Sequence, residues 1–272
     1  MNSIITDTLC NKVYFSSSIT RYQCWRVLEP LLTQFHIPFA MVRHTNDLWV
    51  RDFMPIQIRE GYMVQFDYHP SYLLGCEKYL TNPLRCTQSL PYSIYQSGLN
   101  LDGGNVIKCD DCVIITDKVF AENPMLSSAE IIDQLQADLQ TEVVIIPHDP
   151  SEPYGHADGM VRYLGSNRLL INHYVDFDVS LRQRLLQVLT PRFSVEELHY
   201  STARYLSTSW AYLNYLQVGN QLFVPQFANR IDEMAYRQLE EGLRLPINPI
   251  PCCTVAKLGG ALNCLSWSVM ES

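Results

Sequence analysis

The chain has 272 residues, of which 47% are hydrophobic and 18% charged, and its formal net charge is −8 at pH 7. This composition is typical of a soluble globular protein that buries a sizeable core. An acidic chain lacks the basic face that a nucleic-acid partner requires, so nucleic-acid binding is excluded, whereas a small cationic substrate is compatible with the charge.

Hydropathy and cysteine usage indicate a cytoplasmic protein. No apolar run reaches the roughly 18 residues of a membrane span, and the first residues lack the basic and apolar regions of a signal peptide. The nine cysteines are odd in number and irregularly spaced, as expected of reduced thiols. Cys109 and Cys112 form one isolated CxxC between two apolar runs, which favours a hairpin turn over a metal or redox site. We therefore expect no metal ion and no membrane partner.

The chain begins with a strand, a helix and a strand, at 12–17, 19–35 and 37–44. Alternating apolar residues then predict strands at 51–59 and 61–69, and a less regular stretch follows them.

A clearer unit of two strands, a helix and a strand comes next. It has a hairpin at 99–109 and 112–116, an amphipathic helix at 127–140 with a serine N-cap, and a buried strand at 142–147. Two further units repeat this order, and the last strand of the chain completes the N-terminal pieces as a fifth unit. The first of these units has its strands, helix and strand at 156–164, 168–174, 179–189 and 193–199. The second has them at 212–219, 221–227, 230–243 and 247–251, and the last strand of the chain is expected at 259–269.

The five units begin near residues 51, 100, 156, 212 and 262, a spacing that is typical of repeat and propeller arrangements. We therefore expect one α/β domain over residues 1–272, in which ββαβ units close into a ring. The first strand of each unit would line the centre, and polar residues at the unit starts would converge there. These residues are Asp52, the segment Asp102–Asn105, His156 with Asp158, Asn214 and Cys264.

Those residue types suit chemistry on a guanidinium group. A thiolate is a strong nucleophile, and a histidine can pass a proton to a leaving group and then activate water. His156 and Asp158 are two positions apart, so in a strand they would share one face. Two carboxylates at one centre repel each other unless a cation lies between them, and a guanidinium binds carboxylates through its planar fork of N–H donors.

Five motifs resemble those of one enzyme family, the agmatine deiminase and bacterial peptidylarginine deiminase-like family of the guanidine-modifying (pentein) superfamily. They occur in the family's order and span residues 46 to 266. The motifs are WVRDFMP (49–55), LDGGNVI (101–107), GHADGMVRY (155–163), AYLNYLQVGNQLFVPQF (211–227) and GGALNCLS (259–266).

The resemblance implies a five-fold pseudosymmetric α/β propeller that needs no metal or organic cofactor. It makes Cys264 the nucleophile and His156 the general acid and base, with Asp52 and Asp158 as guanidinium ligands. The implied reaction passes through a covalent amidino-thioether on Cys264 and yields a ureido product and ammonia. Agmatine is the first candidate substrate.

Other residues are expected around this centre. The candidates for substrate contact are Trp49, which could equally pack in the core, Asn105, Asn214 and Glu152. Close backbone approach or a positive φ is expected at Gly103, Gly104, Gly259 and Gly260. Leu258, Ala261 and Asn263 stand where the family typically has glycine, asparagine and histidine.

Several alternatives remain open at this stage. The same chemistry would serve a methylarginine hydrolase or an amidinotransferase. This chain is shorter than typical agmatine deiminases, and a more open site could accept an arginine side chain. The changed residues beside Cys264 also suggest a guanidine-binding protein without turnover. A ring of this size could form a homodimer.

Overall fold

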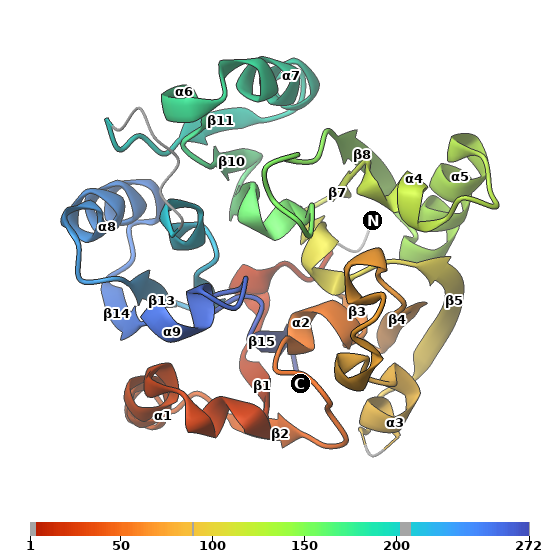
Figure 1. Cartoon of the computed structure of the whole chain (residues 1–272), viewed down its shortest axis with the longest axis horizontal. Coiled ribbons are helices and arrows are strands. Elements are labelled where there is room, and N and C mark those ends of the chain that lie inside the picture. Colours follow the sequence, from red (N-terminus) through yellow and green to blue (C-terminus); the bar gives the residue numbers. More distant parts are fainter. Residues whose placement is uncertain (1–3, 89, 202–207, 272) are drawn as a thin grey trace.

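The structure is a computed structural model that describes residues 4–88, 90–201 and 208–271. Its strands form five sheets of three strands each, arranged around a common centre with helices outside them (Figure 1). In every sheet the first strand runs antiparallel to the second, and the second runs parallel to the third. The predicted five-fold α/β ring is therefore confirmed.

The strands occupy equivalent places in the five units. The first strands are β3 (Ile56–Arg59), β6 (Val106–Lys108), β9 (Val161–Gly165), β12 (Leu216–Val218) and β15 (Ser266–Val269). The second strands are β4 (Tyr62–Asp67), β7 (Cys112–Thr116), β10 (Arg168–Ile171), β13 (Gln221–Gln226) and β1 (Lys12–Ser16). The third strands are β5 (Ile94–Asn100), β8 (Glu142–Ile146), β11 (Ser194–Glu197), β14 (Ile247–Pro251) and β2 (Phe39–Val42). The ring closes where β1 pairs with β15, as the sequence predicted.

One helix between the second and third strands covers the outer side of each unit (Figure 1). These helices are α3 (Pro83–Thr87), α5 (Ser128–Leu139), α7 (Val179–Leu189), α8 (Arg230–Leu243) and α1 (Gln23–Gln34). In α5, Ser127 and Glu130 form a capping box, and the stripe Ile131, Leu135 and Leu139 is fully buried. α1 begins later than predicted because the chain first makes a 3-10 helix, η2 (Ser17–Arg21).

Single helical turns precede the first strands and correct part of the strand prediction. They include α2 (Val50–Phe53), η5 (Gly103–Asn105), η6 (Ala157–Gly159) and η7 (Ser209–Tyr212). The strands predicted at 99–109 and 156–164 are therefore interrupted or begin later, because glycine, aspartate and asparagine favour turns. His156 and Asp158 do not lie on one strand, although both still reach the centre.

The remaining short helices connect strands or border the centre. They are η1 (Asp7–Leu9), η3 (Ser71–Leu73), η4 (Glu77–Tyr79), α4 (Lys118–Glu122), α6 (Tyr174–Phe177) and α9 (Cys253–Ala256). The predicted hairpin turn at the CxxC is confirmed, since the Cys109 amide donates to the Cys112 carbonyl at 2.9 Å. All nine cysteines are free thiols. Among the described residues, no helix is long and apolar enough to cross a membrane.

Candidate active site

The polar residues at the ring centre come mainly from the helical turns before the first strands. α2 carries Asp52. η6 begins directly after His156 and carries Asp158. Asn214 follows η7, and Cys264 lies in a turn that leads into β15. The five units surround one centre (Figure 1). Side chains from distant parts of the sequence are therefore in contact there.

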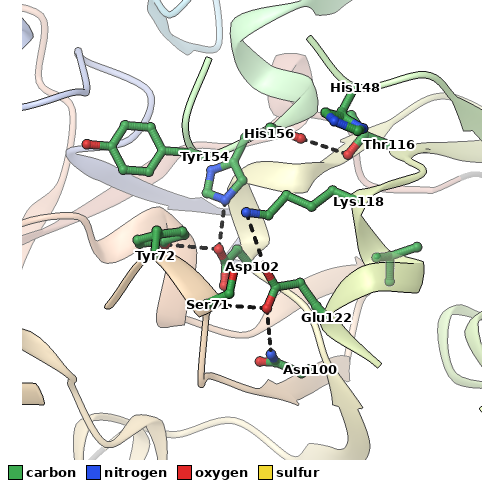
Figure 2. Close-up of polar contacts among 12 residues, drawn as sticks. Ser71, Tyr72, Asn100, Asp102, Thr116, Lys118, Glu122, His148, Tyr154 and His156 are labelled. Carbon is green, nitrogen blue, oxygen red and sulfur yellow. Dashed lines mark hydrogen bonds and ion pairs between the residues drawn. The ribbon is translucent and has the colours of Figure 1, made fainter. Parts of the chain in front are cut away.

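His156 is buried between two carboxylates. Its Nε2 forms a hydrogen bond with Asp102 (Figure 2), at 2.7 Å from Oδ2. Its Nδ1 lies 3.6 Å from Asp52 Oδ1. Burial by itself would lower the pKa of His156, but Asp52 and Asp102 outweigh it and raise the pKa to about 10. At neutral pH the ring is therefore an imidazolium that can deliver a proton.

The direct partnership of Asp102 with His156 was not predicted, although Asp102 belongs to a segment expected at the centre. The same Oδ2 also accepts a hydrogen bond from the Tyr72 hydroxyl at 2.9 Å (Figure 2). The sequence signals were the place of Asp102 at a unit start and within the motif LDGGNVI. Asp102 therefore orients the imidazole by a charge-assisted hydrogen bond.

The thiol of Cys264 lies beside Asp158. Its Sγ donates to Asp158 Oδ2 at 3.4 Å. The same oxygen accepts from Asn214 Nδ2 at 3.0 Å and from Asn263 Nδ2 at 2.7 Å, and Asn214 Oδ1 accepts from the Cys264 amide at 3.2 Å. Burial, and then the charges of Asp158 and Asp52, raise the pKa of Cys264 well above its usual range. The resting side chain is therefore a neutral thiol.

Asp52 lacks a hydrogen-bond partner for Oδ1 among the described residues, although the residue is 93% buried. Burial raises the pKa of Asp52 well above its usual range, His156 opposes this rise, and Asp102 and Asp158 add to it. Three carboxyl groups thus share the centre with one imidazole. Three buried carboxyl groups beside one imidazolium leave an excess of negative charge, so the centre is suited to bind a cation.

A cavity of about 380 Å³ opens over Asp52 and Cys264. Its described lining includes a second carboxylate, Asp47, and no lysine or arginine. The walls are rich in aromatic side chains. These are Tyr22, Trp49, Tyr72, Tyr79 and Tyr154. Such a site can hold a cation through carboxylates at its floor and aromatic faces along its walls.

The segment from Ser71 to Tyr79 forms one wall and is fixed to α4. Glu122 accepts from the Ser71 hydroxyl at 2.6 Å and from the Ser71 amide at 3.0 Å. Lys118 Nζ lies 3.2 Å from the same carboxylate, and Figure 2 shows these groups beside His156. This attachment holds Tyr72 where it reaches Asp102.

The four predicted glycines allow close approach of the backbone to the site. A Cβ on Gly104 would lie 2.5 Å from Asp52 Oδ1 and 2.9 Å from His156 Nδ1. A Cβ on Gly260 would overlap the Trp49 ring. Gly103 is likewise packed on a neighbouring carbonyl, and Gly259 has a φ of +98° beside Tyr154. Side chains at these positions would displace the groups that border the cavity.

Two of the residues predicted to contact substrate accept hydrogen bonds from the protein backbone. Asn105 Oδ1 accepts from the amides of Thr116 and Ala157 at 3.1 and 3.2 Å. Glu152 Oε2 accepts from the two amides that precede His156, at 3.0 and 2.6 Å. Neither residue is among those that line the cavity. Trp49 does line it, and Asn214 lies behind it beside Asp158.

The fold is shared with solved structures of low sequence identity. The C. jejuni agmatine deiminase is 15% identical, with a TM-score of 0.74 over 99% of this chain and 96% of that chain. The agmatine deiminase of Enterococcus faecalis is 15% identical, with a TM-score of 0.75 over 98% and 95%. The DDAH from Pseudomonas aeruginosa is 12% identical, with a TM-score of 0.63 over 96% and 100%. No curated protein sequence gives a match. The chain thus has the α/β pentein fold.

A family model identifies the particular branch of this fold. The model of the Porphyromonas-type peptidyl-arginine deiminase family matches residues 19–269. The chain therefore belongs to that family, and the resemblance seen in its motifs is confirmed.

Proposed function

We propose that the protein is a hydrolase that deiminates a small cationic guanidine, with agmatine as the first candidate. The observation that carries this proposal is the buried Asp52 carboxyl, whose Oδ1 has no hydrogen-bond partner among the described residues. It lies beside His156 and lines the same cavity as Cys264. A guanidinium offers the planar set of donors that such carboxylates bind. Asp52 and Asp158 would hold it over the thiol.

Substrate binding also activates the nucleophile in this proposal. The negative charges of Asp158 and Asp52 add to the effect of burial in raising the pKa of Cys264. A bound guanidinium neutralises those charges, so it lowers the pKa of the thiol and favours loss of its proton to solvent. The thiolate then forms mainly when a substrate is present.

The two steps of the reaction follow from the contacts of His156. The Cys264 thiolate forms a bond to the guanidinium carbon, one C–N bond breaks, and the nitrogen leaves as ammonia with a proton from His156. Neutral His156 then accepts a proton from water as the water oxygen attacks the amidino-thioether. The hydroxyl on the carbon then loses its proton to solvent as the C=O bond forms, the C–S bond breaks with its electron pair going to sulfur, the thiolate is restored, and a ureido product leaves.

The cavity lining supports a substrate with a cationic tail. Asp47 and Asp52 are the carboxylates among the described lining residues, which include no lysine or arginine to pair with a carboxylate tail. Burial raises the pKa of Asp47, so a nearby ammonium group would also relieve the cost of its charge. Agmatine ends in an amine, whereas free arginine carries an α-carboxylate.

A ureido-product assay tests the proposal. The substrates are agmatine, free arginine, methylated arginine and an arginine peptide. The matched variants are Cys264→Ala and Cys76→Ala, because both thiols line the cavity. We expect turnover of agmatine by the wild type and by Cys76→Ala and none by Cys264→Ala. Folded wild-type protein that turns over none of the four would contradict the proposal and favour a guanidine-binding protein.

A further inference from the structure

A buried group of three cations lies at the ring centre around one carboxylate, that of Asp7. Its Oδ1 lies 3.8 Å from Arg51 Nη1 and 3.6 Å from Lys108 Nζ, and its Oδ2 lies 3.6 Å from Arg162 Nη2. The three cationic side chains are 5 to 10% exposed. Within the described chain, Asp7 is the one acidic residue that forms an ion pair with any of them. Asp7 is therefore their shared counterion.

Two of these cations are close in sequence to a residue of the candidate site. Arg51 precedes Asp52 in α2, and Arg162 is four residues after Asp158 in β9. Arg51 also donates its backbone amide to the Cys264 carbonyl at 3.2 Å. A shift of these cations would consequently move the backbone and side chains of the site.

Arg162 makes the most direct connection to the site. Its Nη1 donates to Asn263 Oδ1 at 2.8 Å, and Asn263 Nδ2 donates to Asp158 Oδ2 at 2.7 Å. An amide has an acceptor at one end and donors at the other, so Arg162 determines which end of Asn263 faces Asp158. Without that hydrogen bond, the amide could turn its oxygen toward the carboxylate and repel it.

Arg162 is itself held on two other sides. Its guanidinium lies over the Tyr215 ring, 4.3 Å from the centroid, and faces the carboxylate of Asp7. Asp7 is anchored by its own segment, since backbone hydrogen bonds join residues 4–11 to four of the five units. The partner residues are Ile58, Asp110, Gly219 and Val269.

We propose that Asp7 is a positioning residue of the active site, which fixes the Asp158 carboxylate beside Cys264 through Arg162 and Asn263. Asp7 lies outside residues 19–269, the segment that the family model matches. The proposal rests on the proposed function, because it assigns the aligned carboxylate to the binding of a guanidinium.

Two alkylating reagents of the same size test this positioning role of Asp7. Chloroacetamidine is a cation that resembles the guanidinium, and chloroacetamide is its neutral counterpart. The measured quantity is the ratio of their rates of modification of Cys264, followed by mass spectrometry. A merely structural role would change both rates alike, whereas misplacement of Asp158 lowers the amidine rate selectively.

Asp7→Asn keeps the shape of the side chain and removes its charge. We expect the amidine-to-amide ratio to fall by roughly tenfold, because small displacements of a binding group have large effects on reactivity. Asn11→Ala is the matched control, since Asn11 joins the same segment to Glu271 and contacts none of the three cations in the described structure. Its ratio should equal that of the wild type.

The outcomes separate the two proposals. A wild-type ratio near one would contradict the proposed function itself. A high wild-type ratio that Asp7→Asn leaves unchanged would overturn only the role of Asp7. If Asp7→Asn does not fold, Arg162→Lys provides the same test, because it keeps the charge and removes the fork that reaches both Asp7 and Asn263. An unchanged ratio in Arg162→Lys would likewise overturn the proposal.

A double variant tests the route through Asn263. Asn263→Ala removes the side-chain hydrogen bonds that join Arg162 to Asp158. We therefore expect Asp7→Asn combined with Asn263→Ala to have the ratio of Asn263→Ala alone. Fold-changes that multiply would overturn this route.

Discussion

The substitution Asp102→Asn isolates the contribution of one charge to the protonation of His156. An asparagine can still accept a hydrogen bond from Nε2, which lies 2.7 Å from the present carboxylate oxygen. The imidazole therefore keeps its orientation and loses an anionic neighbour. Because that anion favours the charged ring, the pKa of His156 should fall from its present value of about 10.

The size of the shift follows from the kind of hydrogen bond. A bond to a charged group contributes about 1 to 1.5 kcal/mol more than a neutral one, which corresponds to a change of about one pH unit. Asp52 remains 3.6 Å from Nδ1, so most of the rise should persist. In the proposed reaction, protonated His156 delivers the proton to ammonia. The alkaline limb of kcat should therefore move to lower pH by the same amount.

Two measurements check this expectation. NMR titration of the His156 ring gives its pKa, and the His156→Gln variant identifies which NMR signal belongs to this ring. The pH profile of kcat gives the pH at which activity falls on the alkaline side. Tyr72→Phe is the matched control, because it removes the other hydrogen bond to Asp102 and keeps the charge. An unchanged pKa of His156 in folded Asp102→Asn would refute the reasoning.

Three further predictions concern the space, charge and stability of the site. Gly104→Ala should lower kcat/KM by about a hundredfold, since its Cβ would displace Asp52 and His156 by about 1 Å. Gly98→Ala is the control and should retain full activity, because its Cβ meets nothing within 4 Å. Equal activities of the two variants would contradict the packing argument. Asp47→Asn should raise KM for agmatine by about two- to fivefold while leaving KM for a neutral alkylguanidine unchanged, and a parallel rise for both would remove Asp47 from tail recognition. The pKa of His156 is raised from 6.5 to about 10, so its imidazolium contributes stability that is complete below pH 6.5 and is lost as the pH rises through about 10. The free energy of unfolding of the wild type minus that of His156→Gln should accordingly decline over this range, and a flat difference would refute the assigned pKa.

The fold was predictable because its signals are periodic. The continuous apolar run of the fully buried strand β7 and the buried stripe of α5 report burial directly. The helical turns that carry Asp52 and Asp158 span four and three residues, too short for any periodicity. The sequence therefore placed these residues at the centre but assigned some of them to strands.

The partners within the site were harder to predict than its members. Cys264, His156, Asp52 and Asp158 were named from residue types, unit starts and motifs. The hydrogen bond from His156 to Asp102, and the ion pairs of Asp7, depend on which side chains face each other across the ring. Sequence spacing carries no information on such facing contacts.

Closure of the ring by β1 and β15 also has a consequence for the growing chain on the ribosome. Lys12 pairs with Val269, so the join unites two strands between which all the other strands of the ring are synthesised. The turn that holds Cys264 precedes this last strand. A nascent chain can therefore fold four units and assemble its carboxylates and imidazole while the thiol is still absent. Under the proposed function, activity would begin only with the closing step, and a chain that stops before Cys264 would have most of the proposed guanidinium ligands and no nucleophilic thiol.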